Sequence, residues 1–137
     1  MNAAVGPSKR RPKAAPKPLE RAVQRGIVSG LRKLGLAVVA VPNGGQYVGN
    51  PTARIRMAMA KRMDGEVAGF PDIMILSKRG PSRVGFLEVK REGADLNTEH
   101  HQRQLDCHAA LIADGHNVAE VNSFDQALEA VKSWGML

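Results

Sequence analysis

Two short apolar runs joined by a turn constrain this chain more than any other feature of its sequence. The runs, 72–77 and 84–89, flank Lys78-Arg79-Gly80-Pro81-Ser82-Arg83, a connection that favours an antiparallel hairpin. Asp72 begins the first run, and the second run ends in Glu88-Val89-Lys90. The paired strands therefore bring two carboxylates and one ammonium group to the same end of the hairpin.

Asp72 and Glu88 together have the chemistry of a divalent metal site, because hard cations prefer oxygen ligands. Glu88 and Lys90 are two residues apart and share one face of a strand, whereas Val89 points into the core and offers its backbone carbonyl as a third ligand. Beside a cation, Lys90 can orient a water molecule or stabilise a developing negative charge. The pattern is typical of metal-dependent phosphodiester hydrolysis.

The residues before Asp72 support this interpretation. Pro71 stiffens the approach to the strand, and Gly69 lets the backbone bend or lets nucleic acid come close. Each motif is weak alone, because Pro-Asp before a strand and alternating Glu and Lys are both common. A surface ion pair at the edge of the sheet is the alternative.

The remaining sequence predicts an α/β fold. Helical periodicity covers 19–34 and 52–63, and an apolar strand is expected at 36–41. After the hairpin we expect a helix from Thr98 to Gly115, a strand at 118–121 and a helix at 123–134. This order is typical of a mixed sheet with helices on both faces, with a right-handed crossover leading into the last strand.

Charge divides the 137 residues into a basic tail, 1–18, and one domain, 19–137. The tail holds five of the 20 basic residues and no acidic residue, so 15 basic residues face 13 acidic ones in the domain. Because the tail is rich in Pro and Ala, we expect it to be disordered. It is either a solubilising leader or a tether to polyanions, and its prolines oppose a mitochondrial transit helix.

The sequence predicts a protein of a reducing compartment that does not cross a membrane. The longest apolar run, 36–41, is too short to span a bilayer, and no secretory apolar segment follows the tail. A single cysteine, Cys107, excludes an internal disulfide and fits the cytosol. Its histidine neighbours suggest zinc, but one sulfur without a CxxC pair argues against such a site, and we expect structural or surface roles for Cys107, His100, His101 and His108.

Three segments in this order resemble the PD-(D/E)XK nuclease superfamily: Gly69-Phe70-Pro71-Asp72, Phe86-Leu87-Glu88-Val89-Lys90, and a glutamine-bearing helix that ends at Gly115. More narrowly, the chain resembles the virus-type replication-repair nuclease (VRR-NUC) family, especially its small phage-type stand-alone members. The resemblance covers about 19–134. It implies a restriction-endonuclease-like core with the order helix, three strands, helix, strand.

The resemblance also implies roles for individual residues. Asp72 and Glu88 would be metal ligands for Mg²⁺ or Mn²⁺, and Lys90 would be the catalytic lysine. Glu20 on the first helix matches an acidic residue of the family and would complete the metal pocket. Gln24 lies one turn later on the same helix face and would support it.

Two further positions match the family less closely. Gln104 stands where the family has a helix glutamine, although one helical turn later than usual, and Gln102 is the other candidate. Asn43, before the Gly44-Gly45 pair, also resembles the family pattern, and a plain turn residue is the alternative there.

Four basic residues of the helix at 52–63 are the expected DNA contacts: Arg54, Arg56, Lys61 and Arg62. The alternative is a solvated helix face. Aromatic residues are absent around them, which favours recognition of the backbone and shape of duplex or branched DNA over base stacking.

The hypothesis from the sequence is therefore a Mg²⁺- or Mn²⁺-dependent DNA endonuclease. The resemblance implies branched substrates such as Holliday junctions or flaps, a homodimer, and a bacterial or phage-infected cytoplasm. Two alternatives remain open: a catalytically silent DNA-binding module of the same fold, and a restriction-type nuclease that cuts a specific linear sequence.

Overall fold

The computed structural model describes residues 19–42, 49–77 and 84–137. Four helices and four strands follow one another along these residues. They are α1 (Glu20–Lys33), β1 (Ala37–Ala40), α2 (Pro51–Met63), β2 (Ile73–Leu76), β3 (Val84–Val89), α3 (Glu99–Ala113), β4 (Asn117–Val121) and α4 (Phe124–Ser133). Every helix and strand that the sequence predicts is present with its ends shifted by no more than two residues. The α/β fold class is confirmed.

The strands form one mixed sheet in the order β1-β2-β3-β4. β2 pairs antiparallel with both β1 and β3, and β3 pairs parallel with β4, which confirms the hairpin and the crossover through α3. Ile73 lies opposite Leu87, so Asp72, directly before β2, lies at the sheet end where β3 reaches Glu88. β3 is an inner strand and Glu88 is 1% exposed, so the alternative of a surface ion pair at the sheet edge is wrong.

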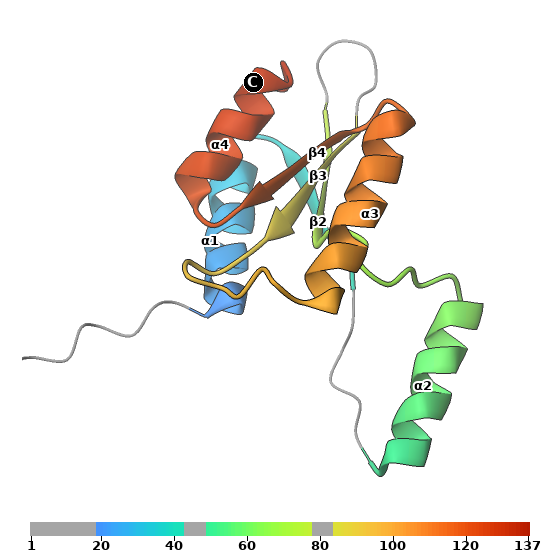
Figure 1. The fold of residues 1–137 in the computed structure, drawn as a ribbon. Coiled ribbons are helices and arrows are strands. Elements are labelled where there is room, and N and C mark those ends of the chain that lie inside the picture. The colour runs from blue at the N-terminus through green and yellow to red at the C-terminus, as the bar shows by residue number, and fades with distance from the viewer. Residues whose placement is uncertain (1–18, 43–48, 78–83) are drawn as a thin grey trace, which may run out of the picture.

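Helices cover both faces of the sheet, as the sequence predicts: α1 and α4 on one face and α3 on the other (Figure 1). Aliphatic side chains of α1, α4 and the strands form the core, among them Ile27, Leu31, Ile75, Leu87 and Val131. The tight contact between α1 and the start of α4 depends on Gly30, because a Cβ atom there would lie 2.4 Å from the ring of Phe124. No helix in the described ranges has the length and apolar character of a membrane span.

α2 lies apart from the sheet and its covering helices (Figure 1). The Asn50 side chain caps it by accepting a hydrogen bond from the Ala53 N–H at 2.8 Å, which satisfies one free donor of the first turn. The helix buries none of its residues, and Ile55, Met59 and Met63 are 61%, 58% and 87% exposed. The apolar spacing of α2 therefore predicts the helix correctly but does not mark a core-facing side.

Two glycines of α1 allow a direct test of the contact with Phe124. Gly30→Ala is expected to lower the free energy of unfolding by about 1–3 kcal/mol, because the added methyl group overlaps the Phe124 ring. Gly26→Ala has nothing within 4 Å of its new Cβ atom and is expected to raise it by about 0.5–1 kcal/mol through helix propensity. Urea unfolding measures both, and equal effects of the two substitutions would contradict the packing described here.

Candidate active site at the end of the hairpin

Backbone groups of both neighbouring strands hold Asp72 in place. The Val89 N–H donates a hydrogen bond to Oδ2 of Asp72 at 2.8 Å, so the side chain extends the pairing of β2 with β3 by one step. On the other side, the Val41 N–H donates to the backbone carbonyl of Asp72 at 2.8 Å. The observed contact between Val89 and Asp72 thus uses the amide of Val89, and the role of its carbonyl as a metal ligand stays a prediction.

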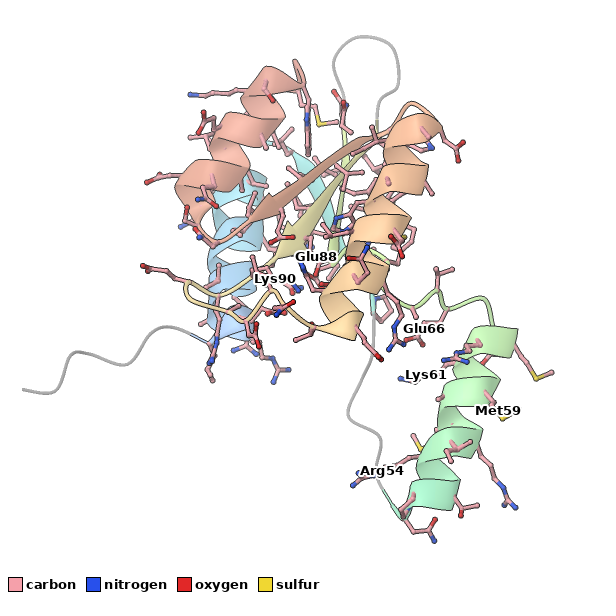
Figure 2. The ribbon with its side chains drawn as sticks, in the orientation of Figure 1. Arg54, Met59, Lys61, Glu66, Glu88 and Lys90 are labelled. Carbon is pink, nitrogen blue, oxygen red and sulfur yellow. The ribbon has the colours of Figure 1, made fainter. Side chains whose placement is uncertain are left out.

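Glu88 lies in a close triangle with Lys90 and Gln104. Gln104 Nε2 donates to Oε1 of Glu88 at 2.6 Å, and the Lys90 ammonium donates to Oε1 of Gln104 at 2.5 Å. Nζ of Lys90 lies 3.4 Å from Oε1 of Glu88. Glu88 and Lys90 therefore share one face of the strand as the sequence predicts, and Figure 2 shows both beside α3.

The structure decides between the two candidate glutamines. Gln104 is 5% exposed and contacts both Glu88 and Lys90. Gln102 donates instead to Asp106 at 2.9 Å on the exposed side of α3. Residues two positions apart on a helix are rotated by about 200°, so only one of the two can face the sheet.

The carboxylates at this point repel one another. The pKa of Asp72 is raised from 3.8 to about 7, first by burial, then by the charge of Glu88 and more weakly by that of Glu20, against the opposing hydrogen bond from the Val89 N–H. Glu20 of α1 also lines the same clefts as Asp72. The sequence-predicted residues Asp72, Glu88, Lys90, Glu20 and Gln104 are thus all brought together.

A hard divalent cation fits this donor set, because it would neutralise carboxylates whose charges now raise the pKa of Asp72. Oε2 of Glu88 is buried and has no hydrogen-bond partner in the described part of the chain. The described residues contain no preformed group of three or more acidic, histidine or cysteine side chains. Asp72 and Glu88 would hold a cation together with water, as one or two carboxylates commonly do for Mg²⁺, and the roles of Glu20 and the Val89 carbonyl as further ligands stay predictions.

Two clefts meet at Glu20 and Asp72. The α1 cleft, of about 1290 Å³, runs along α1 and is lined by Arg21, Gln24, Arg25, Arg32 and Lys33 among others. The α2–α3 cleft, of about 450 Å³, is lined by Lys61 and Arg62 of α2 and by His100, Arg103 and Gln104 of α3. The carboxylates thus stand where the two clefts join. Basic residues outnumber acidic ones in the α1 cleft, whereas the α2–α3 cleft has three of each, Glu66 among the acidic ones.

The predicted DNA contacts divide between those near the site and those away from it. Lys61 and Arg62 line the α2–α3 cleft, and Figure 2 shows Lys61 and Met59 leaving opposite sides of α2. Arg54 and Arg56 lie outside that lining, and Nε of Arg54 donates to the carbonyl of Gly49 at 3.1 Å. Asn43 lies outside the described residues.

The sequence analysis missed His108, which also contacts this site. Its Nε2 lies 3.5 Å from Oε2 of Glu88, and neither atom has a hydrogen-bond partner among the residues described. His101, Gln104 and His108 are the buried residues of α3, and their spacing of three and four is that of one helix face. This polar stripe was visible in the sequence, but there the histidines were expected only to have structural or surface roles, after zinc binding had been argued against.

The other members of that zinc alternative have different surroundings. His101 Nε2 lies 3.0 Å from Oε2 of Glu120, on the neighbouring strand β4. The pKa of the Cys107 thiol is raised, first by burial and then by the charge of Glu88. A thiol that stays protonated at neutral pH is a poor metal ligand.

Gly69 connects the segment before Asp72 to α3. Its φ of +80° lies in the left-handed region, and a Cβ atom there would come within 2.8 Å of the Arg103 carbonyl and 2.9 Å of the Gln104 nitrogen. The close approach that the sequence predicts at Gly69 is therefore made by the α3 backbone. This contact fixes Gln104 relative to Asp72.

The raised pKa of Asp72 predicts how stability depends on pH. A carboxyl group whose pKa is 3.8 when unfolded and about 7 when folded gives stability below pH 4 that is lost as the pH rises to 7. Asp72→Asn keeps an acceptor for the Val89 N–H without the charge. We compare the free energy of unfolding of Asp72→Asn with that of wild type at each pH. The difference in favour of the variant is expected to be about 2 kcal/mol larger at pH 8 than at pH 4.

Urea unfolding at the two pH values measures this difference, with Asp114→Asn at the exposed end of α3 as the control for losing a carboxylate. A gain that does not change with pH would contradict the crowding of charges at Asp72.

Comparison of the chain with protein-family models, with curated proteins and with solved structures finds no match, so the function is inferred from the geometry of the site alone.

Proposed function

We propose that this protein is a Mg²⁺- or Mn²⁺-dependent DNA endonuclease whose active site is centred on Asp72, Glu88 and Lys90. The observation that carries the proposal is their convergence. Lys90 Nζ lies 3.4 Å from Oε1 of Glu88, and the N–H of Val89, next to Glu88, donates to Oδ2 of Asp72 at 2.8 Å. Burial and then the charge of Glu88 raise the pKa of Asp72. Two carboxylates and a lysine where the basic α1 cleft meets the α2–α3 cleft suit the hydrolysis of a phosphodiester.

Each residue has a distinct task in this proposal. Asp72 and Glu88 would hold the cation, whose chemistry is to activate water and to neutralise charge on the phosphate. Glu20 and the carbonyl of Val89 would complete the ligand set. Lys90 orients the attacking water and stabilises the charge that develops on phosphorus-bound oxygen, as the bond to the 3′ oxygen breaks and a 5′-phosphate is left.

Gln104 is a positioning residue in this scheme. It donates to Glu88 and accepts from Lys90, so it holds the carboxylate and the ammonium group at a fixed separation. Such a bridge, together with the ion pair of 3.4 Å between Lys90 and Glu88, keeps the lysine close to the proposed metal site. The buried surroundings of Glu88 strengthen each of these interactions.

The substrate and the cellular setting follow from the resemblance to VRR-NUC nucleases. We propose branched duplex DNA, such as a Holliday junction or a flap, as the preferred substrate, in a bacterial or phage-infected cytoplasm. The α1 cleft beside the carboxylates is lined by arginine and lysine and by no aromatic residue among those described, which favours contacts to the phosphate backbone there.

A cleavage panel tests the proposal. Wild-type protein is incubated with linear duplex, nicked, flap and four-way DNA in Mg²⁺, Mn²⁺ or EDTA. We expect cutting of the branched substrates that needs the metal and falls at least about 100-fold in Asp72→Asn. Asp114→Asn, which removes an exposed carboxylate at the far end of α3, is expected to keep wild-type activity.

The panel also separates the alternatives. A silent DNA-binding module would bind these substrates without cutting any of them in either metal. A restriction-type nuclease would cut linear duplex at one sequence and gain nothing from a branch. Equal cutting by wild type and Asp72→Asn would show that the activity does not arise from the site proposed here.

The resemblance further implies a homodimer, which would place two active sites on opposing strands. We expect twice the mass of the single chain in sedimentation equilibrium at micromolar concentration. A mass of one chain across that range would contradict the dimer and would leave paired cutting of a junction without a structural basis.

A further inference from the structure

α1 carries a row of cationic side chains to which the proposed function has so far given no role. Arg21, Arg25, Arg32 and Lys33 line the α1 cleft together with Glu20 and Asp72. Arg32 is anchored, because its guanidinium donates to the Val38 carbonyl at 2.8 Å. The side chains of Arg21 and Arg25 are exposed and form no hydrogen bond or ion pair with any other described residue.

The buried side of α1 determines which way the row of cationic side chains faces. Ile27 and Leu31 are fully buried in the core, so α1 cannot rotate without exposing them. Arg21 and Arg25 are four residues apart and therefore stand about 6 Å apart along the helix axis, with Arg32 about 10 Å further. The positive charges extend from the carboxylates along the helix.

The size and charge of the α1 cleft favour an extended polyanion over a small ligand. At about 1290 Å³ the cleft is larger than the 300–1,000 Å³ typical of pockets for small molecules. Glu20 and Asp72, at the active site, are the acidic residues of its lining, against four basic ones. A chain of phosphates can neutralise such a row and release its own counterions.

Resting on the proposed function, we propose that the α1 cleft holds the DNA backbone on one side of the phosphate that is cut, and the α2–α3 cleft holds it on the other. The two clefts share Glu20 and Asp72, so a backbone that occupies both must pass the carboxylates between them. The enzyme then needs phosphates on both sides of the cut. It therefore acts within a strand and not at its end.

The test compares two double variants and one single variant of the full chain with wild type. Arg21→Ala/Arg25→Ala removes the free charges of the α1 cleft, and Lys61→Ala/Arg62→Ala removes two from the α2–α3 cleft. Lys132→Ala removes an exposed charge of α4 that lines neither cleft. Fluorescence anisotropy with labelled four-way DNA in EDTA measures affinity between 50 and 200 mM salt, so that binding is read without cutting.

We expect the α1 variant to bind about tenfold more weakly at 100 mM salt and the slope of log K against log salt to decrease by about 2. Lys132→Ala is expected to match wild type in both. Ethylation interference on the bound DNA should show phosphate contacts on both sides of the cut for wild type. The α1 variant should lose those on one side and the Lys61/Arg62 variant those on the other.

The outcomes separate this inference from the proposed function. Affinity within twofold of wild type and an unchanged salt slope for the α1 variant would overturn the inference, even where wild type cuts DNA. Binding that depends on Arg21 and Arg25 without cutting would support the cleft and overturn the endonuclease. Absence of DNA binding by wild type would overturn both. Circular dichroism melting checks that the variants, all changed at exposed positions or cleft walls, remain folded.

Discussion

Burial of the Glu88 carboxylate in the middle of the sheet is the constraint on which the rest of the site depends. A charge removed from water is strongly destabilising unless other groups replace its hydration. Here an amide from α3 and an ammonium group from the same strand approach one of its oxygens, and His108 lies near the other. The local structure of β3 and the sequence of α3 are thus tied to a single acidic side chain.

This arrangement explains why α3 is polar on the face that packs against the sheet. Covering helices normally present apolar side chains to a sheet, as α1 and α4 do with Ile27, Leu31 and Val131. The buried residues of α3 are instead His101, Gln104 and His108. The contact between α3 and the sheet therefore has less apolar packing than the contact on the other face. Such a local loss of packing is expected near functional sites.

Sequence reasoning succeeded where the signal was local. The apolar runs of β2 and β3, the caps at Thr98 and Ser123 and the glycine after α3 specify these elements, and pairing in a hairpin then brings Asp72 to Glu88. It failed where the outcome depends on how a helix is rotated or where it is docked. The contact of His108 with Glu88 and the cleft along α1 both depend on the packing of whole helices.

Net charge was a poor guide for the same reason. The domain is nearly balanced, with 15 basic against 13 acidic residues, yet four basic residues gather along the α1 cleft. The carboxylates of Glu20 and Asp72 line the same cleft, so charges of opposite sign lie close together at the candidate site. A count of charges cannot reveal such a pattern, because it arises from the directions of α1 and α3 relative to the sheet.

The absence of a side chain at Gly69 limits which residues can replace it. Both its left-handed φ and the 2.8 Å approach to α3 forbid even a methyl group, so two independent barriers oppose any substitution. A homologous chain with a larger residue at this position would have to push α3 outward, and the bridge between Glu88 and Lys90 would open with it. The spacing of the candidate site residues therefore depends on the absence of a side chain at Gly69.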